Sequence, residues 1–106
     1  MELVLMQNRN ADFLIKPVNP DGTAYTPDGS ITDVVFAVRS GEFGNVLISK
    51  DLEWDEDQSG YVLNLEASET AVLSEGEYAY GIYYVTTDGG IYDLIETERL
   101  FVKRSV

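Results

Sequence analysis

Residues 77–86, EYAYGIYYVT, decide the fold. The stretch is dense in aromatic and β-branched residues, which predicts a long β-strand. Because side chains alternate along a strand, Tyr78, Tyr80, Ile82 and Tyr84 share one face. Phenol rings bury a large area, and their hydroxyls can reach backbone partners. The tyrosine-rich face is therefore predicted to point into the core.

Similar stretches continue in both directions from residues 77–86, separated by turn signals. Asp88-Gly89-Gly90 predicts a tight turn, and the strand that follows it is expected to bulge near residues 96–98. Two Pro-Asp-Gly signals within residues 19–30 predict a loop or wide hairpin. Residues 68–73 are expected to form a helical turn capped by Ser68. The expected strands are residues 1–6, 13–18, 33–39, 45–50, 61–65, 77–86 and 91–103.

About seven short strands at a spacing of roughly 8–12 residues favour a two-sheet sandwich over a fold of alternating strands and helices. The 106 residues are the usual size of one domain, so residues 1–106 are expected to form a single unit. Hydrophobic residues make up 44% of the chain, which is normal for a globular domain. The predicted fold class is all-β.

Charge and composition exclude several classes of function. The formal net charge is -12, so the surface repels nucleic-acid backbones and anionic membranes. The chain has neither histidine nor cysteine, which removes the commonest general base, thiolate metal sites and disulfides. No signal peptide is expected at residues 1–6, since a basic start and a long apolar run are both missing. We therefore expect a non-enzymatic protein without a cofactor.

Tyr78 carries the more specific fold argument. It opens a strand after the turn Ser74-Glu75-Gly76, and this resembles the tyrosine corner of immunoglobulin-like domains. In an antibody domain a cysteine would stand two residues later, where this chain has Tyr80. Phe36 is expected to fill the core position that tryptophan takes in such domains. The predicted architecture is an immunoglobulin-like antiparallel β-sandwich with Phe36, Gly76, Tyr78 and Tyr80 as structural residues.

The second half of the chain contains a recognisable series of residues: Leu65, Glu69-Thr70, Leu73, the Gly76-x-Tyr78-x-Tyr80 motif, Asp88-Gly89, and the stretch from Leu94 to Val102. In this series, residues 65–106 resemble the immunoglobulin-like domain of phage baseplate upper proteins and related tail-associated proteins. This resemblance implies a structural or assembly module of a phage or prophage particle, in the tail or baseplate. It further implies a virion component made in the bacterial cytoplasm, whose partners are other copies of itself or other phage structural proteins.

Two alternative sites also follow from the residues. Tyr25, Trp54, Tyr83 and Tyr92 could form a sugar-stacking platform, so the alternative function is a carbohydrate-binding or adhesion-type β-sandwich. The acidic segment 51–60, DLEWDEDQSG, alternates oxygen ligands of the kind that calcium prefers. It lacks the spacing of an EF-hand, and we expect a solvated hairpin without a metal.

Strand alternation also predicts an interaction surface. If Phe36, Tyr80 and Leu100 point inward, their neighbours form an outward sheet face with no acidic residue at its centre. Arg39 and Arg99 are expected at its margin. Contiguous apolar patches usually mark interaction sites, and a loop of residues 19–30 covering this face is the alternative. The predicted interface residues are Val35, Ala37, Ala79, Gly81, Tyr83, Val85 and Phe101.

Overall fold

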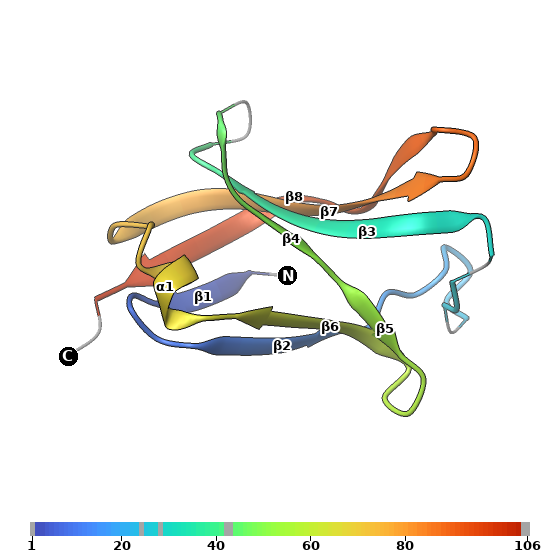
Figure 1. Ribbon diagram of the computed structural model, residues 1–106, viewed down its shortest axis with the longest axis horizontal. Coiled ribbons are helices and arrows are strands. Elements are labelled where there is room, and N and C mark those ends of the chain that lie inside the picture. Colours follow the sequence, from blue (N-terminus) through green and yellow to red (C-terminus); the bar gives the residue numbers. More distant parts are fainter. Residues whose placement is uncertain (1, 24, 28, 42–43, 105–106) are drawn as a thin grey trace.

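The computed structural model describes residues 2–23, 25–27, 29–41 and 44–104, which form two β-sheets packed face to face (Figure 1). One sheet has five strands in the order β1-β8-β7-β3-β4, and the other has three in the order β2-β6-β5. The predicted all-β sandwich is confirmed. The strands are β1 (Leu3–Met6), β2 (Ala11–Ile15), β3 (Ile31–Arg39), β4 (Val46–Asp51), β5 (Glu53–Asp55), β6 (Gly60–Leu65), β7 (Gly76–Thr86) and β8 (Ile91–Lys103).

Strands β3, β7 and β8 lie side by side, as predicted, and both of their pairings are antiparallel. The expected bulge in β8 is also present, because Tyr80 pairs with Glu98 whereas Ile82 pairs with Ile95. A second register shift follows between Ile82 and Tyr83, and the sequence did not predict it. Extra residues on one strand of a pair increase its local twist and bend.

The described residues contain eight strands rather than about seven, because the acidic segment forms more structure than expected. Strand β4 runs on to Asp51, the chain crosses to the second sheet at Leu52, and β5 pairs with β6 in a hairpin. The predicted strand at residues 13–18 is shifted and ends at Ile15. Pro17 cannot donate a backbone hydrogen bond, which accounts for that early end.

The N-terminal strand pairs in a way that local sequence does not encode. Strand β1 lies parallel to β8, with Leu3 opposite Leu100 and Leu5 opposite Val102. All four of these side chains are buried in the core. The pairing places the two ends of the chain in one sheet (Figure 1).

The prediction that Ser68 caps a helical turn is wrong. The helix α1 (Ala67–Thr70) begins after Glu66, whose backbone N–H donates to the Glu69 carboxylate over 3.0 Å. The next backbone N–H donates to Asn10 Oδ1 over 2.7 Å, so a residue far away in sequence closes this end. No helix among the described residues is long or apolar enough to cross a membrane.

The core lies between the two sheets and contains the tyrosine-rich face of β7, as predicted. Phe36 is 0% exposed and Tyr80 is 1% exposed, and their ring centroids are 5.6 Å apart. Tyr78 and Tyr84 pack against this core from the two ends of β7. Burial, followed by the charge of Glu98, raises the pKa of the Tyr80 hydroxyl to about 12.

Candidate docking face

The five-stranded sheet has a second apolar side that points away from the core. On β3, Val34, Phe36 and Val38 belong to the core, so Val35 and Ala37 point outward. The registers of β3 with β7 and of β7 with β8 carry this alternation across the sheet. We call this side the outer face. It contains all seven residues of the predicted interface: Val35, Ala37, Ala79, Gly81, Tyr83, Val85 and Phe101.

The centre of the outer face is low and closely packed. Val35, Ala37 and Ala79 are only 7%, 5% and 8% exposed, although no second layer of the described chain covers them. Tyr83 rises beside them and is partly buried. A hollow of about 80 Å³ lies here, lined among others by Ala37, Ala79, Gly81 and Tyr83. The apolar surface is therefore a shallow depression bounded by larger side chains.

Acidic residues surround the central positions of this face, and one of them, Asp93, also lines the hollow. Asp93 lies opposite Tyr83 on β8, and Asp51 lies opposite Val35 on β4. Asp33 lies opposite Val85, and Glu77 lies opposite Phe101. The central positions are free of acids in a chain that carries 19 of them.

The two arginines lie closer to the centre than predicted. Arg39 and Arg99 both pair with Ala79, one from β3 and one from β8, so they flank it directly rather than marking the margin. Both are exposed. The Arg39 guanidinium donates to the Gly44 carbonyl oxygen over 3.5 Å. In the described part of the chain, the single ion pair is Lys50 with Glu69.

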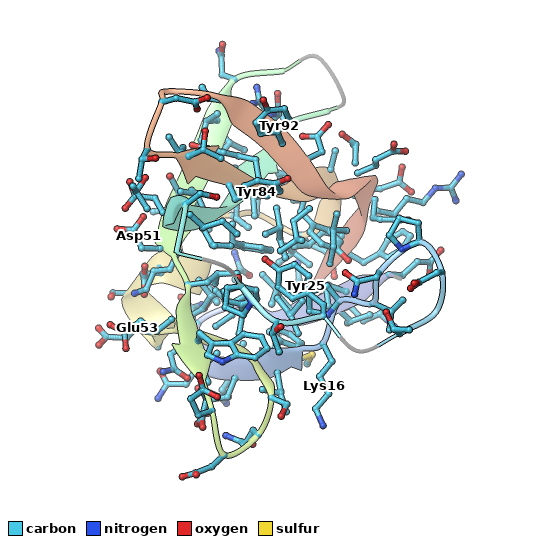
Figure 2. All side chains as sticks on the ribbon, turned by 90° about the vertical axis from the view of Figure 1, so that its right-hand side faces the viewer. Lys16, Tyr25, Asp51, Glu53, Tyr84 and Tyr92 are labelled. Carbon is cyan, nitrogen blue, oxygen red and sulfur yellow. The ribbon has the colours of Figure 1, made fainter. Side chains whose placement is uncertain are left out.

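The alternative that residues 19–30 cover the outer face is wrong. Tyr25 of this loop packs against Trp54 and Tyr61, with its hydroxyl 3.0 Å from that of Tyr61. Figure 2 shows Tyr25 at the open end between the two sheets. The loop therefore closes the end of the core, and residues 24 and 28 within it lie outside the described residues.

The four aromatic residues proposed as a sugar platform do not share a surface. Tyr25 and Trp54 meet edge to face with centroids 6.1 Å apart, at the open end of the core. Tyr83 lies on the outer face. Tyr92 is 53% exposed and stacks on Tyr84, with an interplanar angle of 29°. The platform hypothesis is wrong in that form, because strand parity and the loop place these rings in three separate environments.

The acidic segment forms a hairpin, and the Asp55 carboxylate accepts hydrogen bonds within its turn. Asp55 accepts hydrogen bonds from the backbone N–H groups of Asp57 and Gln58 and from the Gln58 side chain, over 2.9, 3.3 and 3.0 Å. The hydrogen bond from the Gln58 side chain is the largest cause that lowers the pKa of Asp55. Asp51 and Glu53 lie exposed along the strand that crosses between the sheets (Figure 2). No group of three acidic residues gathers as a metal site among the residues described.

Tyr78 forms the hydrogen bond expected of a tyrosine corner. Its hydroxyl donates to the backbone carbonyl oxygen of Ser74 over 2.8 Å, and the Ser74 hydroxyl lies 3.2 Å away. Between them Gly76 has a φ of 156°, a conformation that L side chains rarely adopt. The corner fixes the start of β7, and with it the alternation that separates core from outer face.

Two long-range contacts in this structure had no signal in the sequence. Thr70 is 0% exposed, and its hydroxyl donates to the Arg9 carbonyl oxygen over 2.9 Å. Lys50 donates to Glu69 over 2.8 Å and joins β4 to α1. Both contacts join segments that only the folded chain brings together.

Comparisons with known proteins bear on the fold. No protein-family model matches the chain, and no curated protein matches it. The structure is similar to a fibronectin(III)-like module of CbhA from Clostridium thermocellum, with a TM-score of 0.54, 16% identity, and coverage of 99% of this chain and 90% of that chain. CopC from Methylosinus trichosporium OB3b has a TM-score of 0.44, 16% identity, and coverage of 91% and 97%. Murine CRIg has a TM-score of 0.44, 11% identity, and coverage of 99% and 92%. The first likeness and the two-sheet arrangement give this chain an immunoglobulin-like β-sandwich fold.

Proposed function

We propose that this chain is a non-enzymatic structural or assembly module that docks through its outer face. The observation that carries the proposal is the apolar centre of that face, bounded by acids that all lie outside it. A solvated sheet face normally alternates to polar residues. An apolar centre within so acidic a chain is the composition expected of a surface that another protein covers.

The titratable groups support a role without catalysis. General acids usually need a carboxyl pKa raised toward neutrality. In the described residues, every carboxyl group with a perturbed pKa is shifted downward, and each of these shifts has a hydrogen bond as its largest cause. These are Asp21, Asp55, Glu69 and Asp88, and they lie in turns or in the ion pair with Lys50.

We further propose that the module belongs to a phage or prophage particle, at the tail or baseplate. The support is the resemblance of residues 65–106 to the immunoglobulin-like domain of phage baseplate upper proteins. The structural likeness to known proteins concerns the fold alone. The proposed site of action is the virion, after synthesis in the bacterial cytoplasm, and the proposed partners are further copies or other particle proteins.

The test is the presence of this chain in purified tailed particles from the organism that carries its reading frame, measured by mass spectrometry. We expect the wild-type chain in the particles and a folded Tyr83→Glu variant excluded from them. Tyr92→Glu is the matched control, because Tyr92 is an exposed tyrosine that lies away from the outer face. Particles that lack the wild-type chain, or that retain both variants equally, would contradict the proposal.

A carbohydrate-binding module is the second candidate, and one hollow favours it. A space of about 380 Å³ at the open end of the sandwich is lined by Trp54 and Tyr61 together with Asp33 and Asp51. However, Tyr61 is 1% exposed, and the Trp54 ring is occupied by contacts with other tyrosines. A glycan array distinguishes the candidates, since saturable sugar binding that Asp51→Asn weakens would favour this second function.

A further inference from the structure

Three rows of side chains cross the outer face from β8 to β4, and their chemistry is ordered. The acidic row is Asp93, Tyr83, Val35 and Asp51; the central row is Gly81, Ala37 and Ser49; the basic row is Arg99, Ala79 and Arg39. The bulges of β8 keep Asp93 and Arg99, which are six residues apart in sequence, opposite Tyr83 and Ala79. On β3 and β7 each outer row lies two residues from the central row. At about 3.3 Å per residue, this is roughly 7 Å on either side.

We propose that the outer face pairs with the same face of a second copy, about a twofold axis running along the central row. The proposal rests on the docking role given to this face above, and it names the partner. Rotation by 180° about that axis exchanges the acidic and basic rows and keeps each strand over its counterpart. Self-complementary pairing of one patch with itself is the usual geometry of twofold dimers.

The twofold rotation places side chains of opposite charge against each other across the interface. Arg99 comes to lie over Asp93 of the second copy, because both positions are on β8. Arg39 lies over Val35 of the second copy, beside its Asp51. The chain has only seven basic residues against 19 acids, yet two of the seven flank the centre of this face. A second copy supplies matching acids at matching positions.

The same rotation also places large side chains of one copy over small side chains of the other. Tyr83 rises on one side of the central row, and Ala79 lies equally far on the other side. Each Tyr83 ring is therefore placed over the small Ala79 of the other copy. Gly81 lies at the axis, and a Cβ there would find only the Ile95 carbonyl oxygen at 3.5 Å. The fold itself thus has room for alanine at this position, and the missing Cβ leaves space for a close approach from outside.

The two outward-pointing residues nearest the ends of β8 also meet favourably under the twofold rotation. Phe101 lies one further step beyond the basic row, and Ile91 lies one further step beyond the acidic row. The rotation brings Phe101 over Ile91, which is 68% exposed in the single chain. Apolar side chains at both ends of the pair are then covered by each other.

The area of the outer face sets the expected affinity of the dimer. Five strands about 4.8 Å apart and eight residue steps of about 3.3 Å span roughly 500 Å² of plane. Stable pairs usually bury about 800 Å² per partner. The dimer is therefore expected to be weak and concentration-dependent, visible in sedimentation equilibrium between about 10 µM and 1 mM.

The decisive experiment uses two single variants and their mixture. Arg99→Asp places two acids against each other across the axis, and Asp93→Arg places two arginines against each other. Each variant alone is expected to dimerise at least about tenfold more weakly than the wild type, because like charges are opposed. In an equimolar mixture both contacts again pair opposite charges, so a heterodimer forms about as tightly as the wild-type dimer.

Control variants make the same changes of charge away from the outer face. Lys16→Asp and Glu56→Arg serve, because both residues are exposed and Figure 2 shows Lys16 projecting near the three-stranded sheet. Neither control is expected to weaken the wild-type association, and their mixture should gain nothing. Circular dichroism checks that all four variants remain folded.

Each outcome decides the question. A wild type that dimerises, two weakened variants and a restored mixture support the twofold pairing. A wild type that stays monomeric to about 1 mM overturns it, as does a variant mixture no tighter than its components. If such a monomer is still found in particles, the docking role stands with a different partner and only the self-pairing fails.

Discussion

Removing the hydroxyl of Tyr78 tests the corner that positions β7. The bond from Tyr78 to the Ser74 carbonyl oxygen is 2.8 Å long and lies at a partly buried position that water can reach. A typical net contribution of a hydrogen bond is about 0.5–1.5 kcal/mol. Because water can replace part of this bond, Tyr78→Phe is expected to cost about 0.5–1 kcal/mol, less than a fully buried bond would.

The change in melting temperature follows from the size of the chain. The entropy of unfolding is about 2.1 cal/mol/K per residue, or roughly 0.2 kcal/mol/K for 106 residues. A loss of about 0.5–1 kcal/mol therefore lowers the melting temperature by about 2–5 °C. Urea denaturation at constant m-value provides an independent measurement of the same free energy.

Two controls isolate the bond to the carbonyl oxygen. Ser74→Ala removes the nearby serine hydroxyl and keeps the carbonyl, and Tyr92→Phe removes a hydroxyl from a tyrosine that is 53% exposed. Each is expected to change stability by less than about 0.5 kcal/mol. Tyr25 does not serve as a surface control, because its hydroxyl meets that of Tyr61. Equal unfolding free energies for Tyr78→Phe and both controls would refute the corner as a stabilising contact.

Two further predictions concern charged groups. Hydrogen bonding from Lys50 holds the pKa of Glu69 below its usual value, so its contribution to stability is present above the unfolded pKa and is lost as pH falls through the folded one. Glu69→Gln should flatten the acid limb of a plot of unfolding free energy against pH, and an unchanged limb would contradict the assigned contact. Millimolar calcium should leave the melting temperature unchanged, because Asp55 is already bonded within its turn; a rise abolished by Asp55→Asn would mean that a native-state calcium site exists.

Local alternation explains which parts of this fold the sequence could predict. The register between β3 and β7 is constant from Asp33 to Arg39, so counting residues in steps of two assigned each side chain to its correct face. The bulge in β8 was also predictable, because polar residues interrupt the alternation near Glu96. The second register shift of β8, at Leu94, has no comparable signal, since the two residues at the shift, Leu94 and Ile95, are both apolar.

Contacts between distant segments account for what the sequence missed. The parallel pairing of β1 with β8 depends on both ends meeting in one sheet. Asn10 rather than Ser68 accepts a hydrogen bond at the start of α1. Ser68 was predicted as the cap only because it stands at the start of the expected helical turn in the sequence. Tyr25 was expected to contribute to a sugar-stacking platform, whereas the folded loop packs its ring against Trp54 at the end of the core.

The three-stranded sheet shows that folding alone does not require an apolar outer face. That sheet buries Leu63 against the same core and packs Phe13 beside it, and its outward side carries Asp12, Asn64 and Glu53 together with Leu14 and Val62. Both sheets obey the same alternation and cover one core, so an outward side that mixes polar and apolar residues is compatible with this sandwich. The five-stranded sheet instead places small apolar residues at the middle of its outward side and moves the acids to the rim. The partner proposed above for the outer face would account for this difference between the two sheets, since a covered sheet face has no need of polar residues at its centre.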